Sequence, residues 1–584
     1  MLTPWRAWLT RAGRWLPSPS DTLLALVSLL TLLVSLQYSD DAVCVHLNLG
    51  LFCVPFLLTA LLGGRLRSAA AVACALGLLV WGVGETKMQF FRQRLGLMDF
   101  YFLSGGANWA IVERYPEMQR ALASWLLLSI VLGFAAWRSE RGRALLAGRW
   151  RVLTGVLLLG WCAGSWAARH HHQWEVFRDD ADCGEQKICG VMARLVYSYC
   201  AFEFIPPASG ADSSGFQRAA ALLVAAPPAP PAALPDVVVW LNESTLDPSQ
   251  YLLPSAELPA LPMFQTSART VAAGQLRVHT FGGRTWLSEF SLLTGLVPAD
   301  FGARKNLVFN GVAPEVSSTL VHRFEAAGYD TLVLMPTSSE FYGAGRTYAQ
   351  IGFDRILTLR DFHEYDQLEG GEWEISDSPR MAETAIKLLR EHRAESARPL
   401  FIYMLSIREH GPYLEDTKVG YGLERAGLRP SLAARLTDYV DRLRALDTAT
   451  ALLEHALTSS ARPALWAYFG DHQANFGEPQ PGYRYDLADP ELITQYQLRA
   501  NYELPRSPAL ALLDIALLPS LIVDSAGIAP DAYFKAQTAM RRLCDGRLRD
   551  CPEAGLVDSY KGYIFDAALG LFGSTLPEAP LSVR

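Results

Sequence analysis

Residues 236–244 read Asp-Val-Val-Val-Trp-Leu-Asn-Glu-Ser, a short apolar run that stops abruptly at polar side chains. A continuous apolar run of this length is typical of a strand that is buried on both faces of a sheet. Similar runs occur at 277–281, 330–335, 400–405 and 464–469. Segments with helical spacing lie at 317–327, 380–395 and 432–457. This alternation predicts an α/β domain with a mostly parallel sheet and helices on both faces.

Polar residues follow four of these runs at the point where each run ends. They are Glu243 after the first, Gly282-Gly283-Arg284-Thr285 after the second, His410-Gly411-Pro412-Tyr413 after the fourth, and Asp471-His472 after the fifth. In a parallel sheet, ligands bind beyond the carboxyl ends of the strands. A segment with helical spacing, 286–294, begins directly after Thr285. We therefore expect these side chains to meet at one edge of the sheet, with Thr285 at a helix N-terminus.

Each of these residues also has a purely structural explanation. Glu243 can be a solvated acid at a strand end, Thr285 can be a helix N-cap, and His410-Gly-Pro is a common turn composition. Together, however, they offer the ligands of a divalent cation. Glu243 and Asp471 supply oxygen, His472 supplies nitrogen and Thr285 supplies a hydroxyl, which makes a four-coordinate site for one ion, zinc or manganese.

A cation at this site would lower the pKa of the threonine hydroxyl and make it nucleophilic near neutral pH. The backbone N–H groups of the following helix would face an anionic substrate group. The arrangement therefore predicts phosphoryl or sulfuryl transfer through a covalent intermediate on Thr285.

The first third of the chain is strongly apolar. Candidate membrane spans lie at 23–36, 43–62, 69–83, 122–137 and 153–168. Arginines are concentrated before the first span, after the second and after the fourth. Because Lys and Arg favour the cytoplasmic side, this pattern predicts a cytoplasmic N-terminus and an exported C-terminal part. The loop after the third span is a weak exception with Lys87, Arg92 and Arg94. Its Phe90, Phe91, Phe102 and Trp109 are compatible with an interfacial segment or a plain connection.

Three regions follow from these patterns. We expect a five-helix transmembrane bundle at 1–170, a juxtamembrane segment and Pro/Ala-rich linker at 171–234, and an exported catalytic domain at 235–584. The net charge of −7 argues against a nucleic-acid partner. Four cysteines fall in spans and are expected to pack as small apolar residues, namely Cys44, Cys53, Cys74 and Cys162. The pairs Cys183/Cys189 and Cys544/Cys551 are close enough in sequence to form disulfides in an oxidising compartment.

Residues 282–295, Gly-Gly-Arg-Thr-Trp-Leu-Ser-Glu-Phe-Ser-Leu-Leu-Thr-Gly, resemble the nucleophile segment of the alkaline-phosphatase/sulfatase superfamily. The chain is most similar to its membrane-anchored branch, the lipoteichoic acid synthases and lipid phosphoethanolamine transferases. This resemblance implies Thr285 as nucleophile, Glu243, Asp471 and His472 as metal ligands, and His410 as a substrate-binding residue that protonates the leaving alcohol. By resemblance of 341–346 and 351–354, Arg346 and Tyr342 contact the phosphate and head group.

Departures from the family patterns narrow this expectation. No cysteine lies near Thr285, whereas the phosphoethanolamine transferases have cysteines there, which favours the synthase-like side. No Cys/Ser-x-Pro-x-Arg motif of true sulfatases surrounds Thr285. No Asp-x-x-x-His pair lies between Glu243 and His472, so we expect a single metal ion.

The resulting hypothesis is a transferase in the bacterial cytoplasmic membrane with its catalytic domain on the periplasmic or extracellular side. It would move a phosphoglycerol or phosphoethanolamine head group from a membrane phospholipid, through phosphothreonine, to an envelope glycan or glycolipid. Two alternatives remain open at this point. One is a metal-dependent phosphodiesterase or phosphatase with water as acceptor, and the other is an inactive envelope scaffold.

Overall fold

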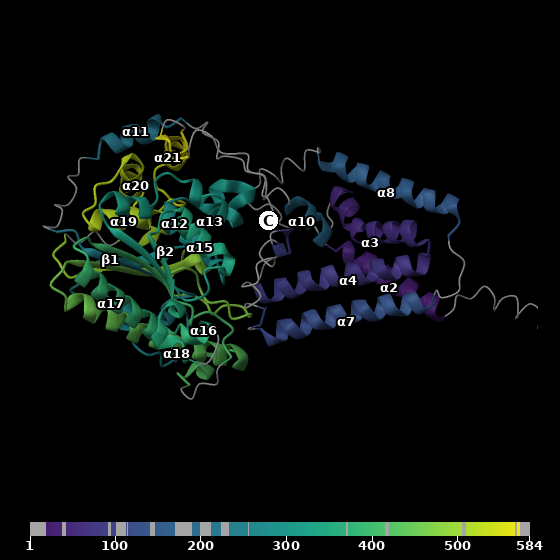
Figure 1. The fold of residues 1–584 in the computed structure, drawn as a ribbon, viewed down its shortest axis with the longest axis horizontal. Coiled ribbons are helices and arrows are strands. Elements are labelled where there is room, and N and C mark those ends of the chain that lie inside the picture. Colours follow the sequence, from purple (N-terminus) through teal and green to yellow (C-terminus); the bar gives the residue numbers. More distant parts are fainter. Residues whose placement is uncertain are drawn as a thin grey trace, which may run out of the picture. The chain divides into compact units, whose positions relative to one another are not determined.

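The structure is a computed structural model. It describes residues 19–37, 42–91, 95–97, 99–100, 112–113, 115–139, 146–169, 190–198, 212–223, 233–254, 256–368, 372–414, 420–504, 510–566 and 569–572. The chain forms two compact units that divide near residue 204 (Figure 1). The first unit is helical and the second is an α/β unit.

The helical unit contains the apolar stretches predicted as spans. Its long helices are α2 (Pro19–Ser35), α3 (Ala42–Gly63), α4 (Leu66–Phe91), α7 (Pro116–Ser139) and α8 (Gly148–Arg169). Within the described residues, Ala42–Gly63, Leu66–Gln89 and Pro116–Ala135 are long and apolar enough to cross a membrane. The apolar helix Thr22–Ser35 is shorter, so a count of five spans stays a prediction.

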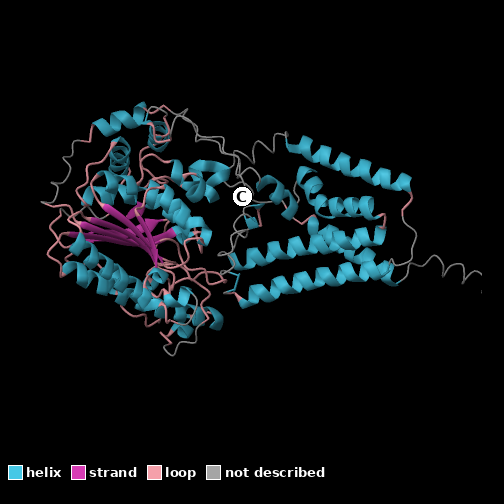
Figure 2. Ribbon diagram, in the orientation of Figure 1, coloured by secondary structure: helices cyan, strands magenta, loops and turns pink. Residues whose placement is uncertain are grey.

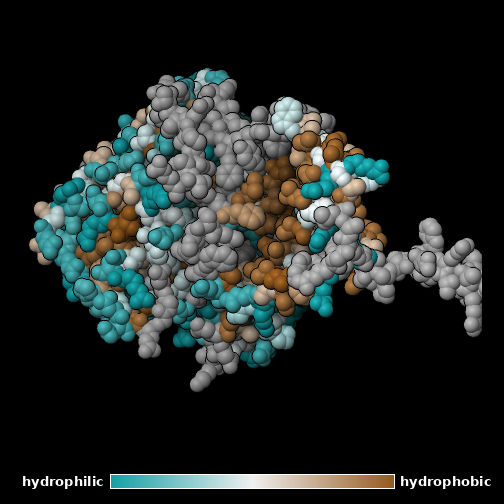
Figure 3. Space-filling view, turned by 45° about the vertical axis from the view of Figure 1, so that its right-hand side comes forward, coloured by the Kyte–Doolittle hydropathy of each residue, from teal (hydrophilic) through white to brown (hydrophobic). Residues whose placement is uncertain are grey.

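The surface of the helical unit agrees with a lipid environment. Figure 3 shows apolar, brown side chains gathered over this unit, whereas the visible surface of the α/β unit is mostly hydrophilic. Leu127, Leu159 and Trp166 each expose more than half of their surface. Of the predicted interfacial aromatics, Phe90 and Phe91 end α4, and the other two lie outside the described residues.

The α/β unit is built on one sheet. Its strands are β1 (Asp236–Asn242), β2 (Thr270–Arg277), β3 (Asp330–Met335), β4 (Arg355–Thr358), β5 (Leu400–Leu405), β6 (Ala464–Gly470), β7 (Ile493–Ala500) and β8 (Leu512–Asp514). Their order is β4-β3-β5-β1-β6-β7-β2-β8. Only β7 runs antiparallel to its neighbours, β6 and β2, while all other pairs are parallel. The predicted mostly parallel sheet is therefore confirmed, with β7 as an antiparallel insertion.

Helices cover both faces of this sheet (Figures 1 and 2). One face carries α17 (Ser378–Glu395) and α18 (Pro430–Thr458), and the other carries α12 (Thr285–Thr294), α19 (Leu518–Ser525) and α20 (Ala532–Leu543). The remaining helices are α10 (Val191–Tyr197) in the helical unit and α11 (Ser214–Ala221), α13 (Val308–Gly311), α14 (Leu320–Ala326), α15 (Ala344–Gln350), α16 (Glu372–Ile375) and α21 (Leu556–Ile564) in the α/β unit.

A hydrophobic core lies under α17 and α18. Leu432, Leu436, Leu443 and Leu446 recur on one side of α18 at helical spacing and are buried against the sheet. Trp240 of β1 is also buried in this core. The apolar stripe explains why the predicted helix at 432–457 was recognisable, and why β1 is apolar on this face.

One predicted strand is placed wrongly. The run at 277–281 was expected to be a strand, but β2 ends at Arg277 and the following residues form a loop. Val278 is fully buried in this loop, so the apolar run continues beyond the strand that it was taken to mark. The correction matters because the loop carries the chain to Thr285.

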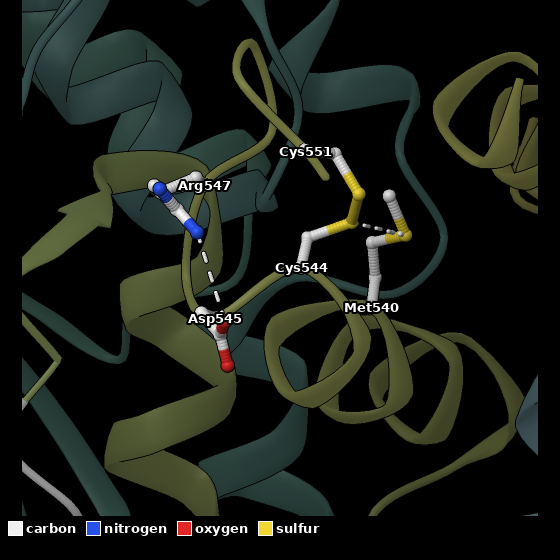
Figure 4. Close-up of a disulfide and its surroundings, with 5 residues drawn as sticks. All are labelled: Met540, Cys544, Asp545, Arg547 and Cys551. Atoms are coloured by element: carbon white, nitrogen blue, oxygen red, sulfur yellow. Dashed lines mark hydrogen bonds and ion pairs between the residues drawn. A yellow bond between two sulfur atoms is a disulfide. The ribbon is translucent and has the colours of Figure 1, made fainter. Parts of the chain in front are cut away.

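Three of the described cysteines are disulfide-bonded. Cys544 and Cys551 form the predicted disulfide after α20 (Figure 4). Cys44 was expected to be an apolar packing residue, but it is disulfide-bonded, so that prediction was wrong. It lies in the first turn of α3. The pair Cys183/Cys189 lies outside the described residues.

Candidate metal and catalytic site

Glu243 and Asp471 follow two neighbouring strands at the same point. The parallel register pairs Asn242 of β1 with Gly470 of β6, so the next residues leave the sheet side by side. A Cβ at position 470 would lie 1.9 Å from the Thr245 carbonyl oxygen, which explains the glycine. The N–H of Ser244 donates to Asp471 Oδ1 over 2.8 Å. The strand register thus places both carboxylates at one edge of the sheet.

Thr285 is brought to this edge by the loop after β2. Gly282, Gly283 and Arg284 all take positive φ, at 65°, 144° and 64°, and α12 begins directly after them. The loop is tied to the Asp471 segment, because Gly282 N–H donates to the Gln473 carbonyl over 3.2 Å. Ser288 Oγ donates to the Asp471 carbonyl over 2.6 Å. The half-buried Thr285 side chain therefore lies against the carboxylates.

The three predicted acidic and histidine ligands form one buried cluster. Glu243, Asp471 and His472 present ligand atoms that all lie within 4.8 Å of one another. His472 Nε2 is 3.3 Å from Glu243 Oε1 and 3.2 Å from Asp471 Oδ2. Thr285 Oγ1 donates to Glu243 Oε2 over 3.0 Å. The structure therefore brings all four predicted metal ligands together.

The polar atoms in this cluster fit a cation. Asp471 Oδ2 and His472 Nε2 are buried and have no hydrogen-bond partner among the residues that the structure describes. Burial and the neighbouring Glu243 raise the pKa of Asp471 well above its usual value, and burial lowers the pKa of His472. Two buried carboxylates repel each other, and a divalent ion offsets that repulsion. A neutral imidazole is also the form that binds metal, so this donor set suits zinc or manganese.

His410 lies on a loop that is joined to the same strand end. Ser406, directly after β5, accepts a hydrogen bond from Glu243 N–H over 3.0 Å. His410 is half-buried, and its Nδ1 donates to the Gly411 carbonyl over 2.7 Å because a carbonyl only accepts. Nε2 is then the nitrogen that exchanges a proton with a substrate. The Trp373 ring meets the imidazole edge-on at 4.9 Å.

Comparison with known families identifies this domain. Residues 235–513, which run from the start of β1 into β8 and include all the ligands above, match the family model described as Sulfatase. The α/β domain therefore resembles the sulfatase family over these residues. The predicted resemblance to the alkaline-phosphatase/sulfatase superfamily is thereby confirmed.

Three known proteins are similar to parts of this chain. An uncharacterized protein of Haemophilus influenzae is 36% identical over 334 residues, which are 57% of this chain and 61% of that protein, less than two thirds of its length. The capsular polysaccharide biosynthesis protein RkpI of Rhizobium meliloti is 22% identical over 435 residues, 72% of this chain and 76% of that protein. The structure of the phosphoglycerol transferase GacH of Streptococcus pyogenes, in complex with sn-glycerol-1-phosphate, has a TM-score of 0.51 and 16% identity, covering 63% of this chain and 95% of that chain. The last likeness concerns the fold.

Arg346 and Tyr342, which were predicted to bind the head group, differ in their exposure to solvent. Arg346 is exposed on α15. Tyr342 is buried, and its hydroxyl donates to Glu289 Oε1 over 2.6 Å. Its ring lies 5.7 Å from that of Trp286, the neighbour of Thr285. Tyr342 therefore packs against the start of α12, and the substrate roles of both residues stay predictions.

Glu289 was not singled out by sequence reasoning. It is fully buried on α12, four residues after Thr285, and Tyr348 donates to its second oxygen over 2.5 Å. Burial raises the pKa of Glu289 to about 7, against the opposing effect of the hydrogen bonds from Tyr342 and Tyr348. The sequence signal that could have identified Glu289 is its spacing, because an acid four residues after Thr285 lies one helical turn away on the same face of the helix.

Arg442 was also missed, although it holds the His410 loop. It is buried on α18, where Asp438 accepts its Nε and Nη2 hydrogen bonds over 2.8 Å each. Its Nη1 donates to the His410 carbonyl over 2.7 Å, and Nη2 donates to the Pro412 carbonyl over 3.1 Å. An Asp-x-x-x-Arg spacing is common on exposed helices, so the sequence does not distinguish this buried pair.

Proposed function

We propose that this protein is a membrane-anchored transferase that moves a phospholipid head-group phosphate onto an envelope glycan or glycolipid. The observation that carries the proposal is the Thr285 hydroxyl, which lies at the start of α12 and donates to Glu243 beside a buried cluster of metal-ligand type. A hydroxyl needs activation to act as a nucleophile. A cation held by the cluster beside Thr285 would provide that activation, so this setting suits covalent catalysis.

The chain's own residues have distinct roles in the first step. Thr285 Oγ1 forms a new bond to the phosphorus while Glu243 Oε2 is in place to accept the hydroxyl proton. The bond from phosphorus to the diacylglycerol oxygen breaks, and that oxygen takes a proton from His410 Nε2. Glu243, Thr285, Asp471 and His472 would hold one zinc or manganese ion. When bound, it lowers the pKa of the threonine hydroxyl and offsets phosphate charge.

The second step reverses these roles. An acceptor hydroxyl gives its proton to His410 and its oxygen bonds to the phosphorus of phosphothreonine. The bond from phosphorus to Thr285 Oγ1 breaks, and Oγ1 takes back the proton that Glu243 accepted in the first step. The exposed Arg346 is proposed to bind the phosphate oxygens or head group, and Tyr342 to shape the pocket beside Trp286.

The proposed substrates draw on the similar proteins. GacH is described as a phosphoglycerol transferase and RkpI as a capsular polysaccharide biosynthesis protein, which supports a phospholipid donor and a glycan acceptor. The apolar helices support residence in the bacterial cytoplasmic membrane. The arginine pattern and the disulfides at Cys44 and Cys544–Cys551 support a multi-pass chain whose α/β domain faces the periplasm.

A labelled-lipid assay tests this function. Purified full-length protein, supplied with Zn²⁺ or Mn²⁺, would be incubated with phospholipids carrying a radiolabelled glycerol or ethanolamine head group and with glycolipid extracted from the source envelope. We expect label on the glycolipid, and none with Thr285→Ala. Release of free head group with no labelled glycolipid would instead establish water as the acceptor. Full transfer by the Thr285→Ala variant would refute the role of Thr285.

A further inference from the structure

The helical unit contains a second site of polar character, separate from the residues discussed above. A cavity of about 70 Å³ lies between the ends of α2 and α4 and the helix α10. Its polar lining comes from Gln37, Trp81, Glu85 and Arg194, and its apolar lining includes Val34 and Met88. Trp81 Nε1 donates to Gln37 Oε1 over 3.4 Å. A cavity with both charges is unusual among helices that are long and apolar enough to cross a membrane.

Arg194 is held in this cavity by specific packing of α10. The residue exposes only 3% of its surface. Ala193 N–H donates over 2.9 Å to Oδ1 of Asn48, which is fully buried in the apolar helix α3. Gly190 lies so close to α2 and α3 that a Cβ there would be 2.7 Å from Asn48 Nδ2 and 2.8 Å from the Gln37 carbonyl oxygen. These contacts fix the guanidinium group beside the membrane helices.

The cavity lies at the end of the helices that the charge pattern assigns to the outer leaflet. α4 begins beside Arg65 and Arg67, which mark the cytoplasmic side, and Glu85 and Met88 lie near its other end. The disulfide-bonded Cys44 lies in the first turn of α3, at the same end as Asn48. The level of the cavity is therefore that of phospholipid head groups.

We propose that this cavity binds the head group of a zwitterionic phospholipid, with its phosphate at Arg194 and its ammonium at Glu85. Arginine is the preferred partner of phosphate oxygens, and an exposed carboxylate is the natural partner of an ammonium. The apolar side chains of Val34, Met88 and Leu95 in the same lining suit the glycerol backbone and acyl ends, which a free phosphate lacks. The binding does not depend on the proposed transfer reaction.

Native mass spectrometry of the full-length protein in detergent tests this proposal. The protein would be titrated with dioleoylphosphatidylethanolamine and, separately, with dioleoylphosphatidylglycerol. We expect the wild type to prefer the ethanolamine lipid. Arg194→Gln should weaken binding of both lipids by roughly tenfold, as expected for loss of a charge-assisted contact. Glu85→Gln should abolish the preference while leaving the binding of the glycerol lipid unchanged.

Matched controls lie at the same end of the unit. Arg120 and Glu117 are exposed on the first turns of α7, outside the cavity, so Arg120→Gln and Glu117→Gln remove the same charges without touching it. Equal lipid binding by Arg194→Gln and Arg120→Gln would overturn the proposal, as would an unchanged preference in Glu85→Gln. If Arg194→Gln does not fold, the Glu85→Gln result decides, because Glu85 is exposed. Because this experiment measures lipid binding and not transfer, a result that overturns the cavity proposal would not contradict the proposed role of Thr285.

Discussion

Thr285 and Glu243 are 42 residues apart in the chain, yet Thr285 Oγ1 donates to Glu243 Oε2 over 3.0 Å. Glu243 follows a central strand, whereas Thr285 is reached from β2 near one edge of the sheet. The two are joined through the Asp471 segment, which binds the loop before Thr285 and the first turn of α12. Thr285 and the proposed metal ligands are therefore joined by hydrogen bonds, and changes to either should affect the other.

Removal of one ligand should empty the metal site. Asp471→Asn and Glu243→Gln replace a carboxylate with a weaker ligand, so we expect each purified variant to retain far less zinc or manganese than the wild type. Elemental analysis after dialysis measures this. Glu424→Gln changes an exposed acid of the same domain and should keep full metal content. Equal metal in all proteins would show that the cluster is not a metal site.

Gly282 should not tolerate a side chain. It has a φ of 65°, and a Cβ there would lie 2.6 Å from Asn475 Cβ. We expect Gly282→Ala to cost about 1–3 kcal/mol of unfolding free energy through overpacking, in addition to backbone strain. Gly427→Ala is the control, because its φ of 76° is also positive but no atom lies within 4 Å of a Cβ there. Similar unfolding midpoints for the two variants would contradict the close contact.

Arg442 should support catalysis without touching substrate. Arg442→Ala removes the arginine that pairs with the buried Asp438 through two hydrogen bonds, and we expect a loss of about 3–5 kcal/mol in unfolding free energy. Transfer should also fall, because the His410 loop loses its donors. Chemical denaturation and the pH profile of transfer measure the two effects.

Two controls separate these effects of Arg442. The nearby Arg444 has a side chain that is 53% exposed, so Arg444→Ala should change stability little. The double variant Asp438→Leu/Arg442→Met removes both charges and should recover most of the stability while transfer stays low. A double variant with normal transfer would rule out positioning of the His410 loop by Arg442.

Glu289 should make stability depend on pH. Burial raises its pKa in the folded chain from 4.5 to about 7, so the folded state binds a proton that the unfolded state releases. Stability from this group is present below pH 4.5 and is lost as the pH rises to about 7. The loss is on the order of 3 kcal/mol.

Glu289→Gln removes this titration and keeps an acceptor for one tyrosine. We expect the unfolding midpoint of this variant to vary less between pH 5 and 8 than that of the wild type. The difference should correspond to the loss of unfolding free energy given above for Glu289. Thermal unfolding of the full-length protein measures it. Glu383→Gln, at an exposed position on α17, should retain the wild-type slope, and an equal slope in Glu289→Gln would contradict the prediction.

The fold could be predicted where apolar runs are continuous. β1, β3, β5 and β6 are almost wholly buried, so their sequences are unbroken apolar runs. β7 includes Thr494, Gln497 and Arg499, whose polar side chains are buried through hydrogen bonds, and its sequence does not resemble a core strand. β8 has only three residues, too few for a pattern.

The candidate site could be predicted to the extent that its residues follow strands. Glu243, Asp471 and His472 come directly after β1 and β6, and a parallel sheet brings such positions together. Glu289 and Arg442 lie within helices, where a polar residue is normally solvent-exposed. Their burial depends on partners more than 30 residues away, such as Tyr342 and His410. No local pattern carries that information.

Detection of the covalent intermediate is the most direct test of the central claim. Full-length protein would be incubated with phospholipid in the absence of acceptor, quenched in acid, digested and analysed by tandem mass spectrometry. We predict a head-group phosphate on Thr285 that disappears when acceptor is added and is absent from Thr285→Ala. A modification on another residue, or label transfer by Thr285→Ala at the wild-type rate, would contradict the account.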